Sequence, residues 1–216
     1  AAKPAAGSPA AKPAAAPPAA EGKAIPKKAP PQAPIDPAIA SLERFGQGIE
    51  RLTLENGLRL VLASDNSAKT VAVSVTYGVG SRDEGPGQSG FAHLFEHMMF
   101  QGSEHVAKGK HFTFITERGG SLNGTTSSDR TNYFEVLPST ELPLAMWLEA
   151  DRMRALAVNA ENFENQRAVV KEEYRMSYEN TAYRTGMLRL GELVFADCPP
   201  YAHPTIGSMK DLDGAK

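Results

Sequence analysis

The chain has 216 residues, of which 41% are hydrophobic and 22% are charged, and its formal net charge is −2. This near-neutral charge gives no electrostatic footprint for nucleic acid or an anionic membrane surface, and apolar stretches such as 71–75 are far shorter than the ~20 residues of a transmembrane helix. The single cysteine, Cys198, excludes an internal disulfide and a cysteine-rich zinc site, so a metal would need histidine and carboxylate ligands.

The N-terminal segment 1–44 differs in composition from the rest of the chain. Its first 40 residues contain 16 alanines, 10 of the 16 prolines of the chain and no aromatic residue. Such a segment buries too little apolar surface to offset the entropy of ordering, so we predict a disordered tether. The sequence does not begin with Met, and no apolar core of a targeting signal is present at its start. Both features fit a mature exported chain whose signal peptide has been removed, although a chain shortened for other reasons would look the same. We therefore expect a periplasmic or secreted protein.

The folded domain is predicted over residues 45–216 and starts with strands. Apolar and polar residues alternate over 49–54 and 58–62, and Asn56-Gly57 between them is typical of a hairpin turn. The β-branched run 70–77 predicts a third strand. A glycine-rich loop follows it and leads into the first helix.

Apolar residues at helical spacing predict most of the remaining elements. The expected helices lie at about 110–118, 139–156, 161–180 and 184–196, and a second pair of strands is expected at 121–123 and 131–136. The helix 139–156 has apolar residues at helical spacing, such as Leu144, Trp147, Leu148 and Met153. Met146 and Trp147 are expected to belong to an amphipathic helix that packs on the sheet, and not to a ligand site. Tyr133 and Phe134 are expected in the core or on a sheet face. Strands mixed with a cluster of helices predict an α+β fold, in which a mixed or antiparallel sheet packs against the helices.

The segment His93-Leu94-Phe95-Glu96-His97 carries the chemistry of the chain. On a helix these polar side chains lie on one face, so both imidazoles can bind one ion while Glu96 stands beside the water of that ion. Two histidines four residues apart with this glutamate form a zinc-hydrolase motif in inverted order. The pattern favours a metal-dependent peptidase.

Two histidines leave the site incomplete, because catalytic zinc usually has three protein ligands and one open position. The predicted helix 161–178 supplies carboxylates, and helical spacing alone does not choose between Glu172 and Glu173. The chain has three further histidines without a paired donor at helical spacing, for which we expect surface or loop roles: His105, His111 and His203.

Four segments together resemble the pitrilysin/insulinase family of zinc peptidases, which includes the mitochondrial processing peptidase. Residues 90–103 are similar to the metal-binding helix of that family almost residue for residue, and the resemblance extends from about Ile49 to the end. The other similar segments are the substrate-facing strand 119–126 with Asp129, Thr131 and Tyr133, the third-ligand helix 166–173, and the later segment 204–208.

The resemblance implies a zinc-dependent endopeptidase that hydrolyses extended or unfolded peptides. One zinc ion per chain is expected on His93, His97 and Glu173, with Glu172 as the alternative ligand and Glu96 as the general base. The expected substrate-binding residues lie on an edge strand that pairs with the peptide backbone, namely Asn123, Gly124, Thr125 and Thr126. The family commonly has a small residue such as alanine where this chain has Gly124.

The resemblance also implies a second homologous half or a partner subunit, because family members enclose the substrate between two halves. This chain stops before the usual final helix and strand of the first domain, so we expect a fragment or one piece of a larger assembly. Two alternatives use the same fold without turnover. One is a non-catalytic structural or partner subunit, and the other is a metal-buffering or peptide-binding module.

Overall fold

The structure is a computed structural model that describes residues 48–65 and 67–215, so the predicted tether at 1–44 lies outside the described residues. The described residues divide into two compact units, with the boundary between Ser64 and Asp65. Among the described residues, no helix combines the length and the apolar character that crossing a membrane requires.

The described part of the first unit is a β-hairpin. Strand β1 (Ile49–Thr53) pairs antiparallel with β2 (Arg59–Ala63), as the alternation of the sequence predicts. The backbone N–H of Leu54 donates to the carbonyl oxygen of Leu58 at 2.8 Å, and Gly57 takes a φ of 86°. The turn thus depends on a residue that adopts positive φ without steric cost.

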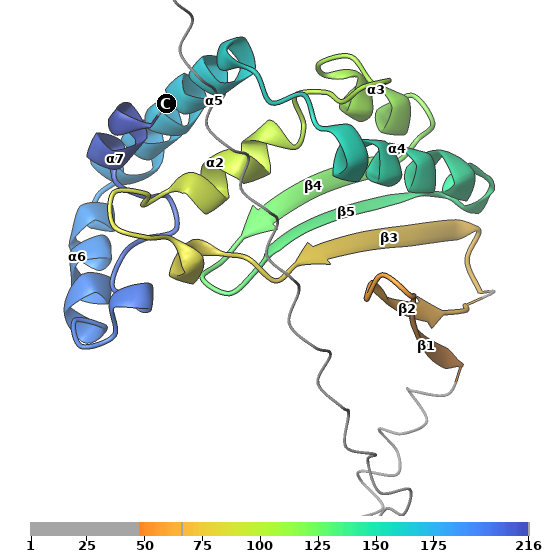
Figure 1. The fold of residues 1–216 in the computed structure, drawn as a ribbon, viewed down its shortest axis with the longest axis horizontal. Coiled ribbons are helices and arrows are strands. Elements are labelled where there is room, and N and C mark those ends of the chain that lie inside the picture. The colour runs from red at the N-terminus through yellow and green to blue at the C-terminus, as the bar shows by residue number, and fades with distance from the viewer. Residues whose placement is uncertain (1–47, 66, 216) are drawn as a thin grey trace, which may run out of the picture. The chain divides into compact units, whose positions relative to one another are not determined.

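The second unit contains a three-stranded antiparallel sheet in the order β3–β5–β4 (Figure 1). Its strands are β3 (Thr70–Tyr77), β4 (Ser121–Thr126) and β5 (Thr131–Pro138). Side chains at alternate positions of β5 are buried, beginning with Thr131, because that face packs against helices. The predicted α+β class with an antiparallel sheet is confirmed.

The helices largely follow the apolar spacing of the sequence. They are α2 (Phe91–Met98), α3 (Lys110–Thr116), α4 (Leu142–Ala155), α5 (Ala160–Tyr174), α6 (Arg184–Val194) and α7 (Met209–Gly214). Single turns of 3₁₀ helix occupy Ser81–Asp83, Ser139–Glu141 and Pro199–Tyr201, and α5 continues as a π-helical turn at Arg175–Glu179. We did not predict α7, although its cap has a sequence signal: the Ser208 side chain accepts from the N–H of Asp211.

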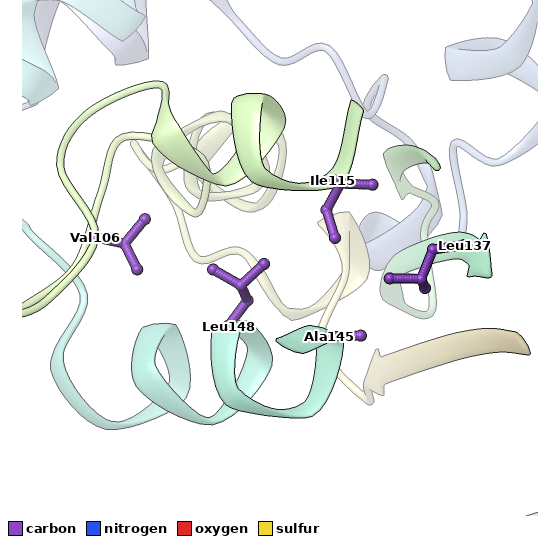
Figure 2. Close-up of a cluster of buried hydrophobic side chains, with 5 residues drawn as sticks. All are labelled: Val106, Ile115, Leu137, Ala145 and Leu148. Atoms are coloured by element: carbon purple, nitrogen blue, oxygen red, sulfur yellow. The ribbon is translucent and has the colours of Figure 1, made fainter. Parts of the chain in front are cut away.

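The main hydrophobic core joins α3, α4 and β5, and Figure 2 shows its side chains. Ile115, Leu148 and Ala145 are fully buried, and Val106 and Leu137 are almost so. Burial of each valine, leucine or isoleucine in this core stabilises the fold by about 1.5–3 kcal/mol.

The inward face of α4 corrects one prediction. Ala145 and Leu148 are buried, as the packing of an amphipathic helix requires, but Met146, Trp147 and Met153 are 44–51% exposed. The inner face continues instead with two charged residues, Glu149 and Arg152, which form a buried ion pair. The apolar pattern misplaces this face because the two charges compensate each other and are buried together.

His111 corrects a second prediction, because it lies on α3 with only 4% exposure rather than on the surface or in a loop. Its Nε2 atom lies 3.5 Å from an oxygen of Glu135, which is buried on β5. His111, Glu135 and Glu149 each contribute an atom to a group whose atoms lie within 4.8 Å of one another. The sequence does not reveal this cluster, because its members come from three elements.

The buried ion pair gives a first testable prediction. Arg152→Met leaves Glu149 as a buried, uncompensated carboxylate, so we expect the free energy of unfolding to fall by about 3–5 kcal/mol. Arg154→Met is the matched control on the same helix, because Arg154 pairs with Glu104 at the surface and such pairs contribute about 0–1 kcal/mol. Urea denaturation followed by circular dichroism measures both, and equal losses would contradict the prediction.

Candidate metal centre

Helix α2 carries the two histidines and Glu96 on one face. Leu94 and Met98 are buried on the opposite side of the same helix and fix its rotation. The side chains of His93 and His97 are 12% and 22% exposed, and their rings meet edge to face with centroids 4.8 Å apart. Both imidazoles therefore face one small region beside the helix.

Helix α5 brings the carboxylate to that region. The helix begins at the Asn159 cap, whose side chain accepts from the N–H of Asn162. Val170 is fully buried in one cluster with Leu94 of α2, Ile206 and Leu212. Because Glu173 lies three residues after Val170, nearly one turn further along the same side of α5, this contact directs Glu173 toward α2.

The three side chains have the spacing of a zinc site. The Nε2 atom of His97 lies 3.4 Å from Oε2 of Glu173, and that of His93 lies 3.7 Å from the same oxygen. Tetrahedral zinc with bonds of about 2.0–2.1 Å separates its ligand atoms by roughly 3.4 Å. Glu172, the alternative ligand, is half-exposed and pairs with Arg175 instead. The geometry therefore distinguishes two glutamates that helical spacing leaves equivalent.

The electrostatics of the three groups differ. Burial lowers the pKa of His93, which favours the neutral imidazole that binds metal. Burial acts in the same direction on His97, but the hydrogen bond and charge of Glu173, together with Glu96 and Gln166, outweigh it and raise the pKa of His97 overall. A metal at His97 would therefore displace a proton from the ring. The hydrogen bond from His97 in turn lowers the pKa of Glu173 and keeps it ionised. The set thus offers two nitrogens and one anionic oxygen.

One ligand lacks a partner behind it. Metal-binding histidines usually donate their second ring N–H to an acceptor that fixes the ring. The Nδ1 atom of His93 is buried and has no hydrogen-bond partner among the residues that the structure describes. The orientation of this ring therefore depends on its packing and on the helix that carries it.

Glu96 lies directly against strand β4. One of its carboxylate oxygens accepts a hydrogen bond from the hydroxyl of Thr126. A Cβ atom at Gly124 would lie 3.1 Å from Cγ and Oε1 of Glu96, so the missing side chain leaves space beside the carboxylate. The strand expected to bind substrate and the expected base are therefore in contact.

Strand β4 pairs only with β5 among the described strands, so its other edge is open. On this strand the N–H of Gly124 donates to the side-chain oxygen of Asn123 at 2.9 Å. Thr125 accepts a hydrogen bond from Arg130 at 3.2 Å, whereas the hydroxyl of Thr126 is engaged by Glu96. The four residues of the predicted substrate strand thus differ in their side-chain contacts.

The other two histidines lie outside this centre. His105 follows α2 in a loop and is half-exposed, with its Nδ1 atom 2.7 Å from the buried Asp151. His203 lies in the connection before α7, with Nδ1 3.5 Å from a carboxylate oxygen of Glu84. Both have the loop positions that their sequence context predicts.

The start of α2 contains two features that the sequence reasoning missed. Glu84 accepts hydrogen bonds from the N–H groups of Gly90 and Ala92, at 2.9 and 2.7 Å. Gly207 passes so close that a Cβ atom there would lie 2.1 Å from Cα of Gly90. The sequence does contain a signal for the first feature. Gly90 at the cap position has no side chain that could accept hydrogen bonds from the first helix amides, so another residue has to accept them.

The fold is α+β, and a His-x-x-Glu-His motif on one helix faces a glutamate from another helix. These features are typical of the zinc metallopeptidases whose motif has this inverted order. The family model described as Insulinase (Peptidase family M16) matches residues 59–189. The chain therefore belongs to this family.

Individual relatives agree with this assignment. The chain is 33% identical over 164 residues to a protein from Helicobacter pylori named zinc protease PqqE. It also resembles the crystal structure of a protease from Helicobacter pylori, with 32% identity and a TM-score of 0.70. A second similar crystal structure is that of the first half of the periplasmic protease PqqL from Escherichia coli, with 25% identity and a TM-score of 0.67.

The lengths of these proteins differ from that of the chain. The match covers 76% of this chain but 37% of the Helicobacter pylori relative. The alignments to the two structures cover 78% and 77% of this chain, and 40% and 37% of the Helicobacter pylori protease and the PqqL half. The chain thus spans well under half the length of the relatives it matches.

The close contact at Gly207 gives the second prediction. Gly207→Ala places a Cβ atom against the backbone of Gly90 at a φ of 84°, so we expect a loss of about 2 kcal/mol or more in unfolding free energy. Gly191→Ala is the control, because no atom lies within 4 Å of its Cβ position inside α6, and alanine there stabilises the helix by about 0.5–1 kcal/mol. Urea titrations of both variants decide the matter, and a neutral Gly207→Ala variant would count against the contact.

Proposed function

We propose that the chain carries the zinc site and the general base of a metallopeptidase that hydrolyses extended or unfolded peptides. The observation that carries the proposal is that Nε2 of His93 and Nε2 of His97 lie 3.7 and 3.4 Å from Oε2 of Glu173. Glu96 belongs to the same helix as the two histidines. Relatives named zinc proteases support zinc as the metal. Glu172 stays outside the proposed ligand set.

Different residues of the chain perform different parts of the proposed reaction. A bound zinc ion would act as a Lewis acid and lower the pKa of a coordinated water toward ~7. Glu96 accepts the proton of the attacking water and returns it to the amine that leaves the cleaved peptide bond. Thr126 donates to one oxygen of Glu96, so the other oxygen is available for that proton. Thr126 therefore orients the base.

The substrate would lie along the open edge of β4. An extended peptide adds to such an edge by main-chain hydrogen bonds, which explains a preference for unfolded segments over folded proteins. The N–H of Gly124 now donates to the Asn123 side chain, and a substrate carbonyl would take over this bond. Because this backbone lies next to Glu96, a peptide bound there has its scissile bond near the base.

The whole active peptidase would include more than this chain. The resemblance to the first half of PqqL, together with the partial coverage of the relatives, supports a second homologous half or a partner subunit that closes over the substrate. The name of that structure also supports an exported, periplasmic location.

The non-catalytic alternatives have less support. A subunit without turnover has no need for a general base, yet the three expected ligands lie together and Glu96 lies one residue before His97 on the same helix. The hydrogen bond from Thr126 to Glu96, which holds this carboxylate in one orientation, also supports a catalytic role for it. We therefore favour the enzyme.

The proposal makes a prediction about metal and turnover together. The purified chain should contain about one zinc per chain by elemental analysis without added metal. Glu96→Gln should keep the zinc but lower peptide hydrolysis by roughly 10²–10⁴-fold, because it removes the base and no ligand. His93→Ala should lose both. Hydrolysis is measured with a fluorogenic unfolded peptide, on the chain alone and joined to its second half.

Near-normal turnover by Glu96→Gln would reject the assigned mechanism. A chain that contains no zinc and takes none up would reject the metal site. Glu172→Gln serves as the control, since this half-exposed residue should change neither zinc content nor turnover.

The contact at Thr126 gives a separate prediction. Thr126→Val keeps the shape of the side chain but removes the hydrogen bond to Glu96, so we expect kcat to fall roughly tenfold with KM nearly unchanged, since one such bond to a charged group contributes about 1.5 kcal/mol. Thr70→Val, the same change at an exposed position at the start of β3, where Thr70 pairs with Pro138 at the far end of the sheet from Thr126, should leave kcat within about twofold. Steady-state kinetics on the two variants would contradict the role of Thr126 if both behaved alike.

A further inference from the structure

The first turn of α2 has an unusual cap. The first amides of a helix lack partners inside the helix, and a side chain at the cap position normally accepts from them. Here the cap residue is Gly90, which has a φ of 100° and makes no side-chain hydrogen bond. The helix that carries both histidines therefore begins without a cap of its own.

A glutamate from the preceding loop fills this role. Oε2 of Glu84 accepts from the N–H of Gly90 at 2.9 Å, and Oε1 accepts from the N–H of Ala92 at 2.7 Å. The side chain is only 5% exposed. Both carboxylate oxygens thus bond to the backbone that immediately precedes His93.

Keeping this carboxylate buried is costly, which indicates a specific role. Burial raises the pKa of Glu84, and the bonds from the two amides and the charge of His203 only partly offset this effect. The position at a helix N-terminus favours an anion, but a neutral cap would satisfy the same amides with less desolvation. What the glutamate adds is a rigid two-point attachment.

The same turn is held from a second direction. Gly207 packs against Gly90, the N–H of Ser208 donates to the carbonyl oxygen of Ser89 at 3.2 Å, and the N–H of Ser89 donates to Asp211 at 3.1 Å. The start of α2 therefore lies between the loop of Glu84 and the segment before α7. A shift of this turn would move His93 and His97 together relative to Glu173.

We propose that Glu84 is a positioning residue for the metal site, which sets the first turn of α2 so that both imidazoles face Glu173. The inference rests on the proposed zinc site. It predicts that Glu84 controls metal affinity and ligand geometry in a chain that remains folded.

The test uses Glu84→Gln, which keeps the size of the side chain but offers one acceptor oxygen to two amides. We expect its zinc dissociation constant, measured by competition with a chelator, to rise about 10–100-fold, as for other residues that hold metal ligands in place. The visible spectrum of the cobalt-loaded chain should also change, because it reports the arrangement of the ligands. Glu117→Gln, at an exposed position, is the control and should bind zinc like the unaltered chain.

Circular dichroism and urea unfolding without metal separate positioning from general stability. Glu84→Asp serves as a milder variant, because its shorter side chain keeps the charge but cannot reach both amides. Positioning predicts weakened zinc binding in folded Glu84→Asp as well. Zinc affinity within twofold of the unaltered chain in either folded variant would overturn the inference.

The remaining outcomes are equally decisive. Loss of the folded spectrum by both variants would overturn the inference, because Glu84 would then support the whole domain rather than the site. Absence of zinc binding by the unaltered chain would reject the proposed function and the inference with it. Normal zinc binding by the unaltered chain and by Glu84→Gln would reject the inference alone.

Discussion

The packing of α2 against α5 is the contact on which the candidate metal site depends. Leu94 and Val170 are both fully buried in it. Leu94 directly follows His93, and Val170 precedes Glu173 by three residues, so the contact that stabilises the domain also sets the separation of imidazole and carboxylate. Hydrophobic burial thus brings two imidazoles of one helix to within 3.4–3.7 Å of a carboxylate from the other.

The domain contains a second polar centre with a different character. Glu149 and Arg152 of α4 lie near Glu135 and His111 between α3, α4 and β5, and the Arg152 guanidinium lies 4.5 Å from the ring centroid of Tyr133. These groups are sealed from water, and only Glu149 and Arg152 are paired, because both carboxylate oxygens of Glu135 are buried without a hydrogen-bond partner among the described residues. The groups near Glu173 are partly exposed instead. Partial exposure suits a site that exchanges metal and substrate, and burial suits a cluster that fixes the packing of helices on a sheet.

Much of the fold was predictable because it depends on local sequence patterns. The strand at 70–77 and the hairpin around Gly57 follow from alternation and turn chemistry, and the structure has them as predicted. The inner face of α4 was not predictable, because a pattern of apolar residues gives no indication that Glu149 and Arg152 are buried as a pair. The burial of His111 was missed for the same reason, since its partner Glu135 lies 24 residues away on a strand.

The candidate site divides in the same way. The sequence by itself determined that His93, Glu96 and His97 share one helical face, because the period of a helix fixes that relation within five residues. Only the tertiary structure decided that Glu173 rather than Glu172 lies within 3.4–3.7 Å of the two imidazoles, and that Glu84 accepts from the first amides of the helix. The reason is physical: helical spacing relates neighbours along one element, whereas the distance between two elements depends on how their buried faces pack.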